Sequence, residues 1–299
     1  MPGVICALLA LNIPAKPSSS RAQTQTRPLT IAILDFGDTG LGRTAPEKLA
    51  ASLKLGSNLV LLDRDQARAA ARGNGYAGSM NLSLDEARNL GAAIGCDFYL
   101  LGDAQTLRRS PSAGPPYFDS YASLFLVSAR TGRLVSWQRP NMRSPTARAA
   151  EESLLAEFSG SGISGPLVAA IRHAQETERN ERELTLDNGT PVIEAAPDDE
   201  KAAEADGLRL PRPFRRITPP YPDSAAEAEA EATVDLLVDL DAQGEVVRVD
   251  VARWAGFGLD QSTIETVRRL HFFPAMRNGV AVPIRILLRY NFRKPPRPE

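Results

Sequence analysis

An acidic stretch rich in alanine and proline constrains the fold of this chain more than any other feature. Residues 184–212 include APDDEKAAEADG and few large apolar side chains. A segment of this composition cannot bury enough apolar surface to build a core, and it is typical of a flexible, self-repelling linker. The chain has 299 residues, about the length of two ordinary domains. The sequence therefore predicts separate cores before and after this segment.

Strand and helix signals alternate in residues 28–183, before the acidic segment. The apolar run Leu29–Phe36 has the length of a buried strand and is followed by the turn-rich sequence GDTGLG. Ser83 and Glu86 have the spacing of a helix capping box. Thr131-Gly132 marks a hairpin turn between two further strands. These signals predict an N-terminal α/β domain with a mixed sheet and a helical region at its C-terminal end.

Residues 213–299, after the acidic segment, have the pattern of a small β-β-α-β domain. Apolar and polar residues alternate on both sides of Ala242-Gln243-Gly244, which predicts a hairpin. Asp260 is the expected N-cap of the helix that follows. Phe272-Phe273-Pro274 then predicts a corner that turns the chain into a last strand, PIRILLRYNF. The fold class expected for the whole chain is α+β.

The N-terminal residues 1–27 resemble a signal peptide and a polar leader. Val4–Ile13 is mostly apolar, and Ser20 and Ala22 give a small-x-small cleavage pattern. A run of this length is too short to cross a bilayer as a helix, which needs about 20 residues. Secretion, with a mature chain that begins near Gln23, is the expectation. The alternative is a loose apolar tail.

Composition and motifs favour a protein without catalytic residues, metal or cofactor. The formal net charge of −1 lacks the basic excess typical of nucleic-acid binding, so no nucleic acid is expected as partner. Asp239–Glu245 does not have the spacing of an EF-hand, and neither glycine-rich loop has the P-loop lysine or the dinucleotide fingerprint. His173 and His271 lie far apart in the sequence. With only two cysteines, no structural disulfide is expected.

Several separated motifs after residue 213 resemble those of the TonB C-terminal domain family. They are TPPYP, TVDLLVDLD, the turn at Gly244, Leu259-Asp260, VRRLHFFPAM, Gly279 and RYNF, and they span residues 213–293. The resemblance implies a periplasmic module of energy transducers that binds an extended peptide of outer-membrane transporters by adding it to its sheet as a strand. The sequence departs from the family pattern in that Ala232 replaces a frequent glycine and Arg253–Gly256 replaces a turn of small residues.

Residues 28–140 are similar to the curli-secretion-channel (CsgG-like) and TolB N-terminal types of envelope domain. The similarity is carried by LTIAILDFGD, NLVLLDRDQ, LGAAIGCDFYLLGDAQ and SARTGRLVSW. It implies an assembly or interaction module and no catalytic residues. The resemblance does not extend to the N-terminal transmembrane helix and the long proline-rich rod of TonB transducers. Val4–Ile13 is too short for that helix, and residues 184–212 are acidic and not dominated by proline.

These observations predict a non-enzymatic adaptor of the periplasm or cell envelope, with membrane association left open. The expected partner is an outer-membrane transporter or another envelope protein, and homodimerisation is an open alternative. In a rival hypothesis the TonB-like domain packs internally or dimerises, so that a strand of the same chain or of a dimer mate covers the edge. The residues expected to bind a partner are Ile217, Pro219, Tyr221, Pro222, Arg285, Leu287, Arg289 and Asn291.

Overall fold

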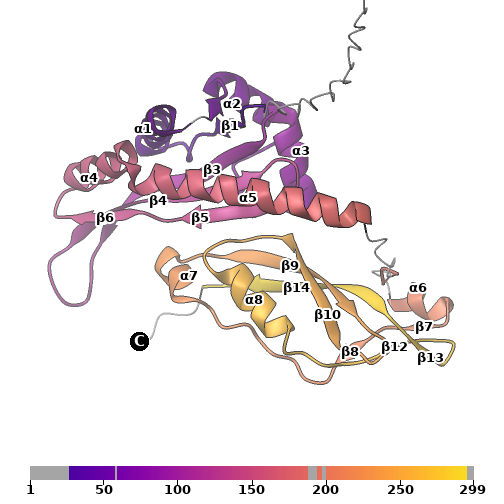
Figure 1. Ribbon diagram of the computed structural model, residues 1–299. Helices are drawn as coiled ribbons and strands as arrows, with labels where there is room; N and C mark the ends of the chain where they lie inside the picture. The colour runs from indigo at the N-terminus through magenta and orange to yellow at the C-terminus, as the bar shows by residue number, and fades with distance from the viewer. Residues whose placement is uncertain (1–26, 58, 188–193, 197–199, 295–299) are drawn as a thin grey trace, which may run out of the picture.

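The computed structural model describes residues 27–57, 59–187, 194–196 and 200–294 (Figure 1). Helices and strands both contribute, so the α+β class expected from the sequence is confirmed. An N-terminal layer of helices and strands lies against a C-terminal sheet that carries its own helix (Figure 1). The predicted signal-like segment lies outside the described residues, apart from Arg27.

The N-terminal sheet is mixed, as predicted, with the strand order β2-β1-β3-β4-β5 and β6 paired to β4. β1 runs parallel to β2 and β3, and the remaining pairs are antiparallel. The predicted hairpin turn at Thr131-Gly132 joins β4 to β5. The strands are β1 (Thr30–Ile33), β2 (Val60–Leu61), β3 (Phe98–Arg109), β4 (Tyr117–Ser128), β5 (Leu134–Gln138) and β6 (Asn141–Ser144).

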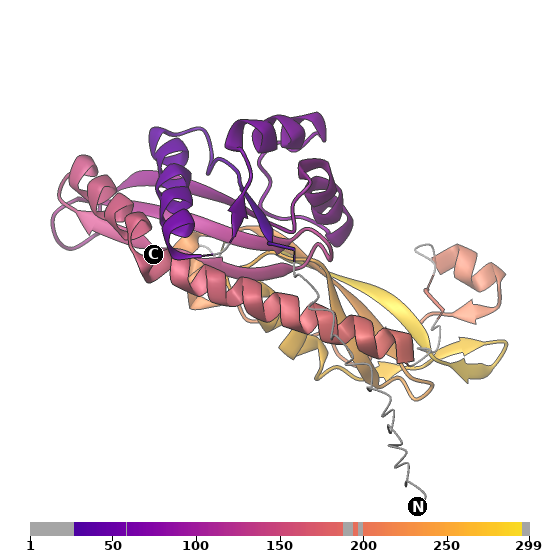
Figure 2. The same ribbon diagram turned by 45° about the horizontal axis from the view of Figure 1, so that its top comes forward.

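Helices cover both faces of this sheet. Successive strand residues point to opposite faces, so Ile31 packs on one side and Ala32 on the other. On the first face lie α1 (Gly40–Gly56), α4 (Ala147–Ser159) and α5 (Ser161–Asp187), and on the second lie α2 (Arg64–Gly73) and α3 (Leu84–Ile94). Figure 2 shows α5 as a long helix running from α4 across the molecule. The second face is only partly covered by α2 and α3, and the C-terminal domain completes it.

The capping box expected at the start of α3 is confirmed. Ser83 Oγ accepts a hydrogen bond from the Glu86 N–H (3.2 Å), and Glu86 Oε2 accepts one from the Ser83 N–H (2.7 Å). No single helix among the described residues has the length and apolar composition needed to cross a membrane. α4 and the part of α5 up to Glu183 meet that criterion only when taken together, across a bend of 44°. Their apolar residues Phe158 and Leu167 are fully buried against the sheet.

The C-terminal domain has the predicted β-β-α-β order. Its sheet is antiparallel with the order β10-β9-β14, and the residues of the helix that face it are buried. A second hairpin, β12-β13, lies between the helix and the last strand. The elements are α7 (Asp223–Ala228), β9 (Ala232–Leu240), β10 (Val246–Arg253), α8 (Leu259–Val267), β11 (Phe272–Phe273), β12 (Ala275–Arg277), β13 (Val280–Val282) and β14 (Ile284–Phe292).

The segment expected to be a linker contains regular structure in its described part. It holds the end of α5, then α6 (Glu200–Ala205), β7 (Leu208–Arg209) and the start of β8 (Arg212–Pro213). β7 pairs with β12 and β8 with β11, and Ala203 and Leu208 are buried. A few small apolar residues are therefore enough to attach its C-terminal end to the C-terminal domain. The domain boundaries themselves stay a prediction.

Asp260 is not the N-cap of α8, contrary to expectation. The N-cap position belongs to Gly258, and Asp260 lies in the first helical turn. Its carboxylate accepts hydrogen bonds from the backbone N–H groups of Ala255 (2.8 Å) and Gly256 (2.7 Å) instead. Asp260 therefore fixes the loop that precedes the helix.

Candidate functional site

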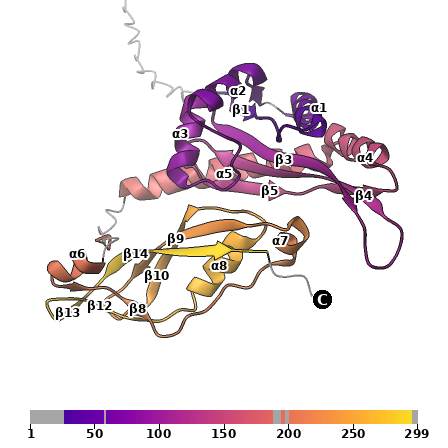
Figure 3. The ribbon, with the colours of Figure 1, turned by 180° about the vertical axis from the view of Figure 1, so that it is seen from behind.

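The C-terminal sheet ends at β14, where the sequence predicts partner binding. β14 pairs with β9 over its whole length, from Ile284 opposite Leu240 to Phe292 opposite Ala232, without a bulge. No named strand among the described residues pairs with its other side. Figure 3 shows β14 on the outer side of this sheet. An unpaired strand edge offers a row of backbone donors and acceptors to an incoming strand.

The direction of the backbone groups of β14 follows from one contact. The Arg285 N–H donates to the Glu194 carbonyl (2.8 Å), and the Arg285 carbonyl accepts from the Ala196 N–H (2.7 Å). Both groups therefore point away from β9. Because these directions alternate along a strand, the N–H and C=O groups of Leu287, Arg289 and Asn291 also point outward. The four predicted edge residues are thus those whose backbone groups point away from β9, and their role in partner binding stays a prediction.

The side chains of these residues form the face of the sheet opposite α8. Arg285 forms a bidentate ion pair with Asp239, with N–O distances of 2.6 and 2.8 Å. Arg289 does the same with Asp235, at 2.7 and 3.0 Å. Between them Leu287 is 46% exposed. Because both aspartates are buried, the two arginines are held in fixed positions beside the edge.

The other predicted binding residues lie across the end of the sheet and not along its edge. The Tyr221 hydroxyl donates to the Ala230 carbonyl (2.7 Å) and also lies within hydrogen-bond distance of the Ala225 carbonyl (3.1 Å), and its ring lies 6.4 Å from that of Phe292. Pro219 is buried, Ile217 and Pro222 are half-buried, and Pro222 directly precedes α7. These four residues contribute to the packing of this end of the domain, and their role in binding stays a prediction.

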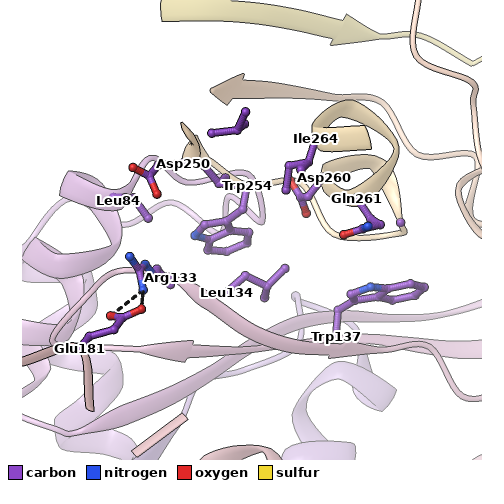
Figure 4. Close-up of a pocket in the computed structure, with 13 residues that line it drawn as sticks. Leu84, Arg133, Leu134, Trp137, Glu181, Asp250, Trp254, Asp260, Gln261 and Ile264 are labelled. Atoms are coloured by element: carbon purple, nitrogen blue, oxygen red, sulfur yellow. Dashed lines mark hydrogen bonds and ion pairs between the residues drawn. The ribbon is translucent and has the colours of Figure 1, made fainter. Parts of the chain in front are cut away.

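The loop between β10 and α8 joins the two domains. Trp254 is 1% exposed, and its indole N–H donates to the Gly132 carbonyl (3.0 Å). Its ring stacks on Phe125 of β4 with 5.9 Å between centroids, and Phe257 meets Phe125 edge to face at 5.4 Å. Figure 4 shows Trp254 directed toward β5, near Leu134. Aromatic residues of the C-terminal domain thus complete the core on the second face of the N-terminal sheet.

Asn81 supplies the polar part of the same interface. Its side-chain amide donates to the carbonyls of Thr233 (2.8 Å) and Trp254 (2.6 Å), and its side-chain oxygen accepts from the Thr233 N–H (3.0 Å). Arg253 donates to the Asn81 carbonyl (2.8 Å) and pairs with Glu86 (3.0 Å). The backbone of Ser83 also forms a β-bridge with Arg253. The end of β10 is therefore covered by the N-terminal domain.

A cleft of about 470 Å³ opens beside this interface, between β5 and α8. Its acidic side chains already have partners: Glu181 pairs with Arg133 (2.7 Å), as Figure 4 shows, and Asp250 with Arg248 (2.7 Å). Burial raises the pKa of Asp260 to about 6, partly offset by its backbone hydrogen bonds. Among the described residues, no group of three or more His, Cys, Asp or Glu side chains could hold a metal ion.

Residues 217–293 match the family model described as Gram-negative bacterial TonB protein C-terminal. The resemblance to this family expected from the sequence is thus confirmed for the C-terminal domain. The chain therefore carries a TonB-like domain, attached to an N-terminal domain that this family model does not cover. No relative was found among curated proteins.

Several solved structures are similar to parts of the chain. The TonB C-terminal domain of Pseudomonas aeruginosa is 20% identical, with 29% of this chain and 90% of that chain covered and a TM-score of 0.26. The hypothetical protein CT253 from Chlamydia trachomatis is 10% identical, with coverages of 46% and 99% and a TM-score of 0.30. The lipoprotein GNA1162 from Neisseria meningitidis is 17% identical, with coverages of 50% and 99% and a TM-score of 0.30. The predicted similarity to CsgG-like and TolB domains stays a prediction.

The interface between the TonB-like domain and the N-terminal domain was not predicted from the sequence. One signal for it was present, because Arg253–Gly256 departs from the family pattern. In the structure Trp254 of that stretch contacts the N-terminal domain, and a Cβ atom on Gly256 (φ +73°) would lie 2.5 Å from the Phe125 ring. A bulky aromatic residue where the family has small ones indicated a contact outside the domain.

Proposed function

We propose that this protein is a non-enzymatic periplasmic adaptor of the TonB type. It binds an extended peptide of an outer-membrane transporter, or of another envelope protein, by strand addition to β14, and it takes part in transport. The observation that carries the proposal is the outer edge of β14, where the backbone groups of four residues point away from the sheet. A peptide gains affinity at such an edge from main-chain hydrogen bonds and specificity from alternate side chains.

The position of the N-terminal domain supports this proposal. It attaches to the end of β10, to Thr233 near the start of β9 and to the loop at Trp254, and none of these contacts uses the outward backbone groups of β14. Docking of the two domains and strand addition therefore use different surfaces. Arg285 and Arg289 are held in place by buried aspartates and flank the edge with fixed polar side chains.

A second candidate function is a structural envelope module that engages no receptor. The buried aromatic contact between the domains favours it, because a TonB-like domain fixed to its own chain has a structural role whether or not β14 binds anything. In that case the edge of β14 stays unused or pairs with a second copy. The two hypotheses differ in what β14 does.

The test compares Leu287→Pro with Leu287→Ala in the full chain. Both variants shorten the side chain, but only proline removes the outward N–H, and an edge strand tolerates proline at such a position. A photo-reactive amino acid at Asn291 captures partners from a Gram-negative outer-membrane extract, and mass spectrometry identifies the cross-linked segment. We expect the parent and the alanine variant to cross-link an extended segment of an outer-membrane protein, and the proline variant to lose at least about 90% of this product.

Equal cross-linking of the same segment in all variants would exclude β14 as the binding edge. Cross-linking of one copy to another through β14 would favour the structural module. Sedimentation of the parent and the proline variant checks this second outcome, because a dimer paired through β14 dissociates when the outward N–H is lost.

A further inference from the structure

A segment of the chain's own acidic stretch lies on the edge of β14. Glu194–Ala196 forms a parallel bridge with Arg285, made of the two backbone hydrogen bonds at 2.8 and 2.7 Å described above. Ala196 precedes Arg285 by 89 positions in the sequence. Such a contact is a short strand addition by the chain itself.

Side chains also hold this segment. The Glu194 carboxylate accepts a hydrogen bond from Arg277 Nη2 of β12 (2.6 Å). Ala196 is half-buried against the apolar core of the C-terminal domain, whereas Ala195, between them, is exposed. The site beside Arg285 therefore accepts an acidic residue opposite Arg277 and a small residue two positions later.

The bridge uses only the first part of the edge. Beyond Arg285, the backbone groups of Leu287, Arg289 and Asn291 point outward, and no backbone hydrogen bond from Glu194–Ala196 reaches them. A longer strand that enters in the same direction can make the bonds of the resident segment and add further ones. Because the resident segment is covalently attached, its effective concentration at the edge is on the order of millimolar, so it competes with any partner.

We propose that the edge of β14 is a shared site, held by Glu194–Ala196 and opened by a partner strand of the same chemistry. That strand is extended, runs parallel to β14, carries a carboxylate opposite Arg277 and has a small residue two positions later. The inference rests on the proposed function, because it adds the ligand class and the internal competitor to the same edge. The acidic stretch between the domains is thus also a regulatory segment.

The test uses a fluorescent synthetic peptide with the sequence of residues 191–199, PVIEAAPDD, titrated into the full chain. Ala196→Pro removes the N–H that donates to Arg285, whereas Ala195→Pro removes an N–H that points away from β14 and serves as matched control. We expect the Ala196→Pro variant to bind the peptide at least about tenfold more tightly than the parent and the Ala195→Pro variant. A peptide with lysine in place of glutamate should bind at least about fivefold more weakly.

Equal affinity of the peptide for the parent and both proline variants would overturn the internal competition. Failure of the peptide to bind Ala196→Pro would overturn the ligand class. Arg277→Gln separates the charge contact from the backbone contact: the glutamate peptide loses its ion pair and the lysine peptide loses a like-charge contact, so the difference between the two peptides should disappear. The cross-linking at Asn291 described above reports on strand addition by itself, so its result distinguishes a failure of this inference from a failure of the proposed function.

Discussion

The two sides of the C-terminal sheet differ in chemistry although they belong to one small domain. At the β10 side, Trp254 and Phe257 pack against aromatic residues of the N-terminal domain. Asn81 forms hydrogen bonds with the backbone groups beside them. At the β14 side, Arg285 and Arg289 alternate with exposed apolar and polar residues, and among the described residues only Glu194–Ala196 pairs with the edge. The first side has the chemistry of a permanent contact, and we propose that the second is an exchangeable one.

Under the proposed function, this difference lets the C-terminal domain attach firmly to the rest of the chain while the edge of β14 stays available to a partner. Large buried aromatic side chains provide most of the stability of an interface, since fully burying one contributes about 1.5–3 kcal/mol. An edge paired through a few backbone hydrogen bonds contributes only about 0.5–1.5 kcal/mol for each bond and can open. The largest effects of mutation are therefore expected at Trp254 and the smallest at the outward positions of β14.

Trp254→Ala is expected to have the largest effect. The substitution removes the stack on Phe125 and the hydrogen bond to Gly132 and leaves a cavity between the domains, at a cost of about 3–5 kcal/mol. Urea unfolding followed by circular dichroism measures this loss, and small-angle scattering should show separation of the domains. Phe273→Ala is the matched control, because that phenylalanine is 58% exposed and its truncation should cost about 0.5 kcal/mol or less. Similar losses in the two variants would contradict the assignment of Trp254 to a permanent interface.

Local signals in the sequence predicted most of the elements and the edge. The capping box at Ser83 and the hairpin at Ala242–Gly244 depend on residues that are close in sequence, and both are present in the structure. Alternation along Ile284–Phe292 identified the residues whose backbone points outward, because that direction depends only on the strand period. The prediction did not need the rest of the fold.

Contacts between distant residues could not be predicted in the same way. Asn81 meets Thr233 across 152 positions, and a lone asparagine before a helix has no pattern that indicates such a partner. The position of Asp260 before the apolar residues of α8 predicted an N-cap. Its carboxylate instead accepts hydrogen bonds from two backbone N–H groups of the preceding loop, at Ala255 and Gly256. The contact of Glu194–Ala196 with β14 was not predicted. The composition of this stretch indicates only that it cannot form a hydrophobic core, and the contact is made by backbone hydrogen bonds, which do not depend on side-chain type.

The second prediction concerns pH and the carboxyl group that holds the Trp254 loop. Burial raises the pKa of Asp260 from 3.8 to about 6, so between these values the folded protein keeps a proton that the unfolded chain releases. Stability from this group is therefore present in full below about pH 4 and is lost as the pH rises through about 6, by at most about 3 kcal/mol. Urea unfolding from pH 4 to 8 should show this decline in the parent relative to Asp260→Asn. Parallel curves for the two proteins would exclude it.

The third prediction tests the polar half of the interface. Asn81→Ala leaves the Thr233 N–H and the carbonyls of Thr233 and Trp254 without their partner, which should lower the free energy of unfolding by about 2 kcal/mol. Asn81→Asp keeps the oxygen that accepts from the Thr233 N–H. It replaces the NH₂ group, which donates to two carbonyls, with a second oxygen that can only accept. We expect it to destabilise at least as much as alanine. Recovery of parent stability in the aspartate variant would show that only the acceptor matters.

The smallest effect is expected at the outward edge, and it sharpens the contrast with the inward positions of the same strand. Leu287→Pro removes an N–H that points away from β9, so its free energy of unfolding should lie within about 0.5 kcal/mol of that of Leu287→Ala. Leu288→Pro removes an N–H that points toward Leu236 of β9 and should cost about 1–3 kcal/mol relative to Leu288→Ala. Urea unfolding of the four variants measures both differences. If proline costs as much at Leu287 as at Leu288, the outward groups of β14 already have a structural partner, and the edge cannot be the exchangeable side of the domain.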